Sequence, residues 1–544
     1  MLTGVVLLLA TGLVVHQVTT SKGSPPRARG GPAEEAGSTT TLAPPPGTSA
    51  WFITHAGQEH DIEGFADRVS IDPGDLLHLY VSTTSPTYAV TVYRMGWYAG
   101  SEATLVSHDD GLVGHVQVPS TLTSPTNTVV ARWSNPVAVS TRAWTPGAYL
   151  IRLDASQGAQ RFIPVTVRGA SAVGKVVLVD AVTTWQAYNA WGGYSLYHGP
   201  AGESDFAHRA RAVSFDRPYL GDGAADFVGN ELPLIALAEH LRLPLDYVTD
   251  VDLHADPHLL DGARAVISLG HDEYWSTAMR AAVTAARDQG TNVAFLGANA
   301  VFRHIRLGPT PIGPDRLETD YKRPNEDPLL HVDPAEVTSD WREPPVPRPE
   351  STLTGAFYEC NPVSADMVIT DPSSWLFAGV GATVGMHVPG LVGAEYDRVN
   401  PAAPTPHPIE VLAHSPVTCR RHPSYSDVAY YTTTSGAGVF DSSTSAWVAS
   451  LTTCTTESCR IRNEVVTMVT TNLLRAFALG PAGLDHPAVD NVAQLDEYRG
   501  DPIARPAPTS GSRTTTSVKR SGKTTTSDTT GTTDTTDTTA LVPD

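Results

Sequence analysis

Two hydrophobic patterns follow each other along the chain. From Trp51 to Arg168, short runs alternate apolar and polar residues and are separated by Pro, Gly and Ser turns, which is typical of half-buried strands. About seven such strands predict an immunoglobulin-like β-sandwich for residues 51–169. Trp97 and Tyr98 lie near one of its turns, and we expect them to contact a neighbouring domain rather than a sugar.

Beyond Lys175 the apolar runs become nearly continuous, as expected for strands covered on both faces of a sheet. Strand-like and helix-like segments alternate there, which predicts an α/β domain over residues 170–480, with a doubly wound parallel sheet of the flavodoxin or glutamine-amidotransferase type. We expect its first four strands in the order 2-1-3-4. The expected strands are 175–180, 245–250, 265–270 and 292–297, and the expected helices are 231–241 and 277–287.

Reactive side chains are concentrated where the third of these strands ends. Residues 271–274, which are His, Asp, Glu and Tyr, follow directly on Gly270, and a helical pattern opens at Ser276. We therefore expect a strand that runs straight into a helix. Ligands of open α/β sheets bind at the carboxyl ends of strands, where the strand order reverses. The segment 183–189, which follows the first strand, should face this junction across one crevice.

Two interpretations of the junction are open. Acidic residues in the first turn of a helix stabilise it through its dipole, and for Asp272 we prefer this structural role. For His271, Glu273 and Tyr274 together we prefer a functional site, because several titratable groups gather in one place. No GxSxG, HExxH, P-loop or GxGxxG motif opens an expected helix, and a histidine at the position of a nucleophile disfavours covalent catalysis there.

The two ends of the chain have compositions unlike those of a folded domain. Residues 1–20 contain an apolar run of signal-peptide length with no Lys or Arg before it, so we expect a signal peptide or a membrane tether. Residues 21–50 are expected to form a disordered linker and residues 481–544 a disordered Thr-rich tail. This organisation predicts a secreted or cell-surface protein.

Four cysteines, Cys360, Cys419, Cys454 and Cys459, lie in the second half of the chain. They do not have the spacing of zinc ligands, so disulfide bonds are expected. Among the three possible connectivities we prefer Cys454 with Cys459 and Cys360 with Cys419. The formal net charge is −20 without a basic patch, which argues against nucleic acid as a partner.

Six ordered motifs resemble one known family, namely N,N-dimethylformamidase and its relatives, in the C-terminal domain of their large polypeptide. The resemblance covers about residues 170–480 and implies a mononuclear iron, held by two tyrosines and a glutamate, that hydrolyses a small formamide. The motifs are GHDEYW (270–275), FLGANAVF (295–302), SFDRPY (214–219), DYVTDVDLH (246–254), LVGAEYDR (391–398) and GVF (438–440) with the later Trp447.

The resemblance also implies which residues hold the iron. Tyr274 and Glu395 are the expected tyrosine and glutamate ligands. The second tyrosine is Tyr188 or Tyr219, and we prefer Tyr188 because its segment should face the junction. Each choice has a structural alternative, since a buried glutamate can be an ion-pair partner and a lone tyrosine can be a core residue with a satisfied hydroxyl.

Beside the iron, we expect His271, Glu273 and Asn299 to take part in catalysis. His271 could orient water or a ligand, or bond a backbone carbonyl, and Asn299 could instead cap the next helix. The expected function is an exported metal-dependent hydrolase of C–N amide-type bonds, with a small-molecule or cell-envelope substrate. The alternative is a non-catalytic cell-surface protein that binds carbohydrate or an envelope polymer.

This chain departs from the family enzyme in two respects. That enzyme works with a small partner subunit, which is not part of this chain, so a homo-oligomer stays open. The export-like start, the expected disulfides and the Thr-rich tail also indicate a different compartment, and a shared fold does not by itself fix the substrate.

Overall fold

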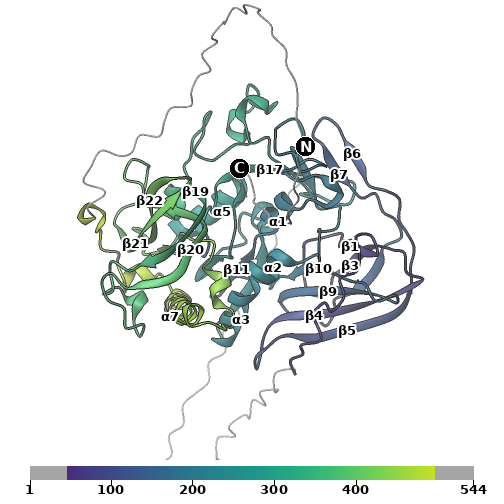
Figure 1. Ribbon diagram of the computed structural model, residues 1–544, viewed down its shortest axis with the longest axis horizontal. Coiled ribbons are helices and arrows are strands. Elements are labelled where there is room, and N and C mark those ends of the chain that lie inside the picture. Colours follow the sequence, from purple (N-terminus) through teal and green to yellow (C-terminus); the bar gives the residue numbers. More distant parts are fainter. Residues whose placement is uncertain (1–45, 496–544) are drawn as a thin grey trace, which may run out of the picture. The chain divides into compact units, whose positions relative to one another are not determined.

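The computed structural model describes residues 46–495 as mixed sheets with few helices (Figure 1). The predicted signal or tether at 1–20, most of the predicted linker and most of the predicted tail lie outside these residues. Within the described part of the chain, no helix is long and apolar enough to span a bilayer.

The N-terminal part contains two sheets that share one hydrophobic core. The strands β1, β3 and β8 form a 3-stranded sheet, and five others form a second sheet in the order β2-β10-β9-β4-β5. Leu77 and Leu79 of the first sheet meet Val90, Ile151 and neighbours of the second. The strands are β1 (Ile62–Ala66), β2 (Ser70–Ile71), β3 (Leu76–Thr83), β4 (Thr87–Tyr98), β5 (Ser101–Val113), β8 (Val137–Ser140), β9 (Gly147–Ala155) and β10 (Gln160–Val167), and a separate pair is β6 (Thr121–Thr123) with β7 (Thr128–Val130).

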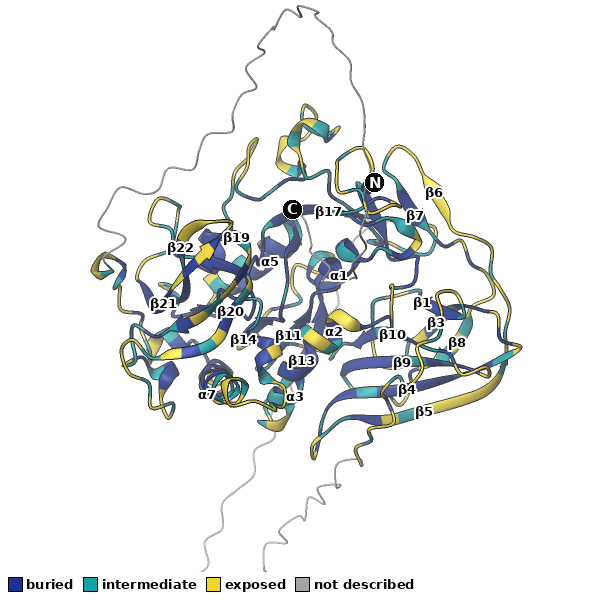
Figure 2. Ribbon diagram, viewed as in Figure 1, coloured by how far each residue is buried: buried dark blue, intermediate teal, exposed yellow. Residues whose placement is uncertain are grey.

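The edge strand β5 is exposed along most of its length (Figure 2). Its outer half carries His108, Asp109 and Asp110. Charged side chains at the edge of a sheet discourage pairing with another chain.

A 7-stranded sheet follows, in the order β13-β11-β14-β16-β23-β22-β21. Its first four strands have the predicted order 2-1-3-4, and all neighbours from β13 to β23 pair in parallel. The strands are β11 (Val176–Asp180), β13 (Leu245–Thr249), β14 (Ala265–Ser268), β16 (Asn292–Phe295), β21 (Ile409–Cys419), β22 (His422–Thr432) and β23 (Gly438–Asp441).

The predicted parallel sheet is only part of the observed one, because β22 pairs antiparallel with both β23 and β21. Successive residues of a strand point to opposite faces, and β11 shows this clearly: Val176 and Leu178 pack with α3 and α7, whereas Val177 and Val179 pack with α4 and α5. The helices are α1 (Val182–Tyr188), α2 (Ala225–Asn230), α3 (Leu232–His240), α4 (Asp250–Ala255), α5 (Thr277–Asp288), α6 (Ser351–Thr354) and α7 (Glu457–Leu479).

The expected direct passage from strand to helix at 270–276 is also wrong. Ser276 caps α5 as predicted, and its side chain accepts a hydrogen bond from the backbone of Met279. However, Tyr274–Ser276 form a short strand, β15, which pairs in parallel with Arg303–Ile305. A 4-stranded sheet results, in the order β12-β18-β17-β15. Its other strands are β12 (Ala212–Ser214), β17 (Arg303–Gly308) and β18 (Leu317–Thr319).

Two disulfide bonds, Cys360–Cys419 and Cys454–Cys459, confirm the preferred pairing. The first joins β21 to the strand pair β19 (Phe357–Val368) and β20 (His387–Arg398). Residues 481–495, at the start of the predicted tail, pack on β21 and β22, where Asn491 accepts a hydrogen bond from the backbone of Val411.

The aromatic turn of β4 lies against α3. The backbone N–H of Trp97 donates to Glu239 over 2.8 Å, and the Trp97 ring lies 4.4 Å from the ring of His240. Arg94 pairs with the same Glu239 at 2.7 Å. Trp97 therefore contacts the segment that follows the N-terminal sheets, as expected from the sequence.

Candidate active site

The site is built on two turns that follow neighbouring parallel strands. After β14 the chain turns at Gly270, and after β16 it turns at Gly297. A Cβ atom placed on Gly297 would lie 1.8 Å from the carbonyl oxygen of Gly270, so the two turns touch backbone to backbone. From Gly297 onward the backbone N–H groups of Val301 and Phe302 bond the carbonyls of Asp272 and Glu273 at 3.0 Å each.

The segment after β11 completes the frame, as the strand order predicts. The hydroxyl of Thr184 accepts a hydrogen bond of 2.9 Å from the backbone N–H of Glu273. Thr183 donates to the carbonyl of Tyr274 over 2.8 Å. These bonds fix α1, which carries Tyr188, against the segment that carries Glu273 and Tyr274.

Three tyrosine hydroxyls converge beside the carboxylate of Glu273. Tyr188 donates to Glu273 Oε2 over 2.8 Å, and the Tyr197 hydroxyl lies 3.1 and 3.0 Å from Oε1 and Oε2. Tyr197 also donates to Tyr188 over 3.0 Å and accepts a 2.7 Å bond from Tyr274. We call these four residues the tyrosine cluster.

A second carboxylate lies on the other side of His271. The Nε2 atom of His271 is 3.1 Å from Glu395 Oε2 and 3.6 Å from Glu273 Oε2. Two amides hold the opposite oxygen of Glu395: Asn299 donates over 3.3 Å and Asn361 over 3.2 Å. His271 therefore lies between two carboxylates, within ion-pair distance of each.

Burial and charge set the protonation of these groups. Burial raises the pKa of the hydroxyls of Tyr188, Tyr197 and Tyr274 well above the usual value, and the negative Glu273 adds to this. Burial also raises the pKa of Glu273, against the opposite influence of His271. For His271 itself, burial lowers the pKa, but the carboxylates, Glu395 foremost, outweigh it and raise the pKa to about 9.

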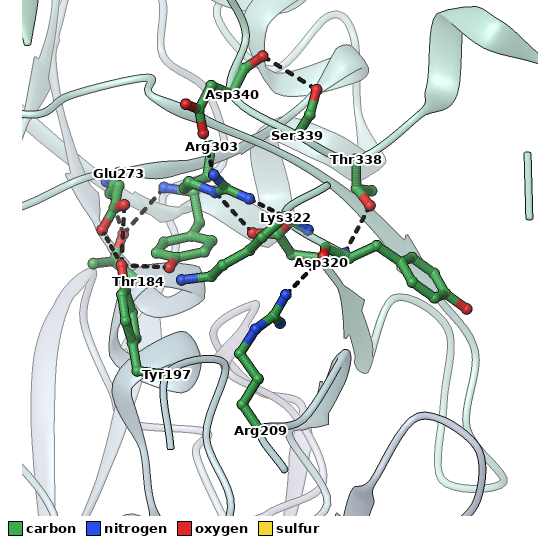
Figure 3. Close-up of polar contacts among 12 residues, drawn as sticks. Thr184, Tyr197, Arg209, Glu273, Arg303, Asp320, Lys322, Thr338, Ser339 and Asp340 are labelled. Carbon is green, nitrogen blue, oxygen red and sulfur yellow. Dashed lines mark hydrogen bonds and ion pairs between the residues drawn. The ribbon is translucent and has the colours of Figure 1, made fainter. Parts of the chain in front are cut away.

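A lysine approaches the tyrosine cluster from the segment that follows β18. The Nζ atom of Lys322 lies 3.2 Å from the ring centre of Tyr197 and 5.6 Å from that of Tyr274, and Figure 3 shows its side chain extending toward Tyr197 and Glu273. Burial and the neighbouring Arg303 lower the pKa of Lys322 to about 7, although Asp320 and Glu273 oppose them.

Asp320 holds this lysine in place. Its carboxylate accepts two hydrogen bonds of 2.9 Å from the guanidinium of Arg303 and one of 2.6 Å from the backbone N–H of Lys322 (Figure 3). A bidentate pair of this kind fixes direction as well as distance. Arg303 belongs to β17 and also pairs with Asp340, so Lys322 rests on a rigid support.

The structure brings together most of the residues predicted from the sequence. Tyr188 and Tyr274 lie in the tyrosine cluster with Glu273, and Asn299 lies beside Glu395. Glu395 is separated from the tyrosines by His271, so it does not share an oxygen cluster with them. Tyr219 does not join the cluster either, because its ring packs against Trp185.

Asp272 is buried and does not serve the helix dipole, because α5 begins only at Thr277. Its carboxylate instead accepts hydrogen bonds from Ser268 at 2.7 Å and from the Trp275 indole at 2.6 Å. The expected helix-dipole role is therefore wrong, and Asp272 fixes the turn after β14.

The sequence did not predict three residues of the site, namely Tyr197, Lys322 and Asn361. Each lies in irregular chain between elements or at a sheet edge, where hydrophobic periodicity carries no signal. Only the richness of the segment 194–198 in Tyr and His could have drawn attention to Tyr197. Lys322 lies within the Pro-rich stretch 308–350, and nothing in its local pattern indicates burial.

The donor set of the tyrosine cluster fits a hard metal ion. Among residues 46–495, no group of three or more His, Cys, Asp or Glu side chains is placed to hold a metal, so phenol oxygens would have to contribute. Tyr188, Tyr197 and Glu273 present oxygens that lie within 2.8 to 3.1 Å of one another. All-oxygen sites suit hard cations, and negative phenolate ligands suit ferric iron in particular.

Comparison with known proteins identifies the family of this chain. No match is found among the curated proteins. Among solved structures, a cycloisomaltooligosaccharide glucanotransferase of Paenibacillus sp., complexed with cycloisomaltoheptaose, is similar at 13% identity with a TM-score of 0.14. That match covers 23% of this chain and 17% of the other, so it carries no argument about fold or function. The family described as N,N-dimethylformamidase beta subunit-like, C-terminal, matches residues 89–460, a match that begins inside β4 rather than near residue 170, and the chain belongs to this family.

Proposed function

We propose that this protein is a metal-dependent hydrolase that cleaves C–N bonds of the amide type. The observation that carries the proposal is the approach of the Tyr188 and Tyr197 hydroxyls to Glu273, with Tyr274 bonded to Tyr197, next to the His271–Glu395 pair. Family membership supports a hydrolase. The strand order and the helices on both faces of the parallel strands support a doubly wound core, which would place this cluster at the rim where such sheets bind ligands.

Tyr188, Tyr197 and Glu273 would hold the metal, for which iron is the proposal. Glu273 replaces Glu395 in this role because it alone reaches the tyrosine hydroxyls. When bound, iron would supply Lewis acidity toward a carbonyl oxygen and toward water. Burial keeps the phenols protonated on their own, so binding should release protons from them.

His271 and Glu395 would move the proton. Hydrolysis adds water to the carbonyl carbon and breaks the C–N bond, and the departing amine must receive a proton. His271, which a pKa of about 9 keeps protonated near neutral pH, lies between both carboxylates and would donate a proton to the amine nitrogen, while a neighbouring carboxylate would accept the proton that water loses. Glu395 is held by Asn299 and Asn361, and it would stabilise the protonated imidazole.

Lys322 adds a positive charge beside the tyrosine cluster. Its pKa of about 7 reflects a group that burial has partly stripped of water. A cation at this position would stabilise negative charge that develops on the carbonyl oxygen or on the tyrosines. Its role would be electrostatic, since its Nζ faces the ring of Tyr197.

Export is also proposed. Both disulfides of the described residues favour an oxidising compartment, in agreement with the signal or tether expected from the sequence. The substrate would then be a small molecule or part of the cell envelope. The family is named after one subunit of an enzyme, so an assay should include a measurement of the oligomeric state.

Metal analysis tests the central claim. The full chain, purified from iron-supplemented cells, should contain near-stoichiometric iron and a visible tyrosinate band. Tyr197→Phe and Tyr188→Phe should each weaken the band and the iron content, whereas Tyr80→Phe, in the N-terminal sheets, should change neither. A colourless, metal-free protein that hydrolyses amides in the presence of chelators would show the proposal to be wrong.

A further inference from the structure

A separate cavity of about 120 Å³ opens beside the tyrosine cluster. Its lining includes four aromatic residues, Trp185, Tyr188, Tyr219 and Phe227, and also Asp226. A cavity that admits one water needs roughly 10–15 Å³ by the same measure, so this one has room for a few non-hydrogen atoms. The hydroxyl of Tyr188 faces Glu273, and its side chain also lines this cavity.

The cavity has the walls of an aromatic box. The Trp185 ring lies 6.2 Å from the ring of Tyr219 at 71° and 6.1 Å from the ring of Phe227 at 72°. Trp185 is fixed by a 2.8 Å bond from its indole N–H to Glu231. Rings that meet at steep angles enclose a volume on several sides, and aromatic faces attract cations.

Two polar groups of the lining are not used by the protein. The amide of Asn189 is fully engaged with Gln186, Trp191 and the backbone around Leu220. The Tyr219 hydroxyl, by contrast, is buried without a hydrogen-bond partner among residues 46–495. Asp226 is exposed, and the positive charge that acts on its carboxyl is that of His271, which opposes the rise of its pKa.

Charges of both signs surround the cavity: Glu318 and Asp226 raise the pKa of the Tyr219 hydroxyl, and Arg217 and Arg316 oppose them. Asp226 lies in the first turn of α2, and its charge is one of those that raise the pKa of His271. An anionic ligand would meet repulsion from this edge and from a chain with a formal net charge of −20. An uncharged ligand would gain from the rings but not from the carboxylate.

We propose that this aromatic box binds a small alkylammonium ion, with its alkyl groups against the rings and its positive charge toward Asp226. The binding follows from the cavity alone. Its role rests on the proposed function: the box would receive the amine half of an amide, and then the amine product. Tyr188 forms the boundary between the box and the tyrosine cluster, so the scissile bond would lie beside Glu273 and His271.

Direct binding tests the box without reference to hydrolysis. Trimethylammonium chloride is titrated into the full chain and followed by calorimetry or ligand-observed NMR at constant ionic strength. The neutral tert-butanol, which has a similar shape, is the control ligand. Trimethylammonium should bind saturably, and tert-butanol should bind at least about threefold more weakly, as an exposed cation–π contact allows.

Two variants locate the ion. Asp226→Asn keeps the shape and removes the charge, and it should weaken trimethylammonium binding about three- to fivefold while leaving tert-butanol unchanged. Asp110→Asn removes an exposed charge from β5 and should have no effect. Phe227→Leu, checked for an unchanged fold by circular dichroism, should weaken binding further by removing one wall.

The outcomes separate the two proposals. Equal binding of both ligands, or equal affinity in wild type and Asp226→Asn, would overturn the alkylammonium site whether or not the protein hydrolyses amides. Saturable, Asp226-dependent binding in a protein that hydrolyses no amide would keep the site and reject the hydrolase. If hydrolysis is found, trimethylammonium should inhibit it competitively. An inhibition constant that is the same in Asp226→Asn as in the wild type would count against the box.

Discussion

Asn361 donates a 3.2 Å hydrogen bond to Glu395, the carboxylate that faces His271. Asn361 is the neighbour of Cys360 in the sequence, and Arg420 is the neighbour of Cys419. Arg420 donates to both the backbone and the side-chain oxygen of Asn361, at 2.9 and 3.0 Å. The Cys360–Cys419 disulfide therefore holds together the pair of residues that orients Glu395.

Removing this disulfide should lower activity. In a Cys360→Ser, Cys419→Ser variant, Asn361 is less well placed, and loss of one hydrogen bond to a charged group is worth about 1.5 kcal/mol or more, or about tenfold in kcat. The measurement is amide hydrolysis well below the unfolding temperature. Cys454→Ser with Cys459→Ser is the matched control, and a similar loss in both variants would refute a local effect.

Lys322→Met should slow hydrolysis while leaving the fold intact. Methionine keeps an unbranched apolar side chain against Tyr197 but removes the positive charge, and an electrostatic stabiliser of a reacting oxygen contributes about 3 kcal/mol, or about a hundredfold in kcat. Steady-state kinetics and thermal unfolding should be measured together. If KM rises and kcat does not change, the lysine serves substrate binding instead.

Arg217→Lys should destabilise the segment that carries two of the tyrosines. The buried Arg217 guanidinium bonds the carbonyls of Asn189 at 2.7 Å, Tyr194 at 2.8 Å and Trp191 at 3.1 Å. A lysine cannot reach three divergent acceptors, and each buried carbonyl left without a donor costs about 1–3 kcal/mol. We expect a loss of about 3 kcal/mol in denaturant unfolding. The exposed Arg132→Lys should be neutral.

Stability should fall as the pH rises from about 4 to about 7. Burial raises the pKa of Asp180 to about 6, and burial followed by Asp180 raises the pKa of Glu231 well above its usual value. A carboxyl with a raised pKa stabilises the fold below its unfolded value of about 4, and this contribution is lost as pH passes the folded value.

Each pKa unit corresponds to about 1.4 kcal/mol, so Asp180 alone should contribute a decline on the order of 3 kcal/mol. Urea unfolding between pH 4 and 7 measures it. Asp180→Asn should flatten the profile, and Asp110→Asn should not. A profile for Asp180→Asn as steep as that of the wild type would assign the pH dependence to other groups.

The sequence predicted which segments of the chain meet at this site better than it predicted which side chains interact there. A continuous apolar pattern predicts strands such as Val176–Asp180, and the connections between strands predict their order. The approach of segment 183–189 to His271–Tyr274 could therefore be expected. The antiparallel strands β21 and β22 could not, because alternating patterns do not reveal which sheet a strand joins.

The pairing of side chains within the site could not be predicted from the sequence, for a different reason. Whether Glu273 or Glu395 accompanies Tyr188 depends on side-chain directions after two turns, and a sequence motif contains no such information. Tyr197 and Lys322 arrive from irregular segments whose paths are set by tertiary packing. The aromatic box combines Trp185 and Phe227, which are 42 positions apart in the sequence and come together only in the fold.

The contact between Gly270 and Gly297 also bears on how such a protein can diversify. The spacing of these two turns depends on main-chain atoms, whereas one side of the cavity is formed by side chains of a different segment, from Tyr219 to Phe227. Substitutions in that segment can therefore change the shape of the cavity without displacing the two turns, so ligand preference could change while the proposed chemistry is retained.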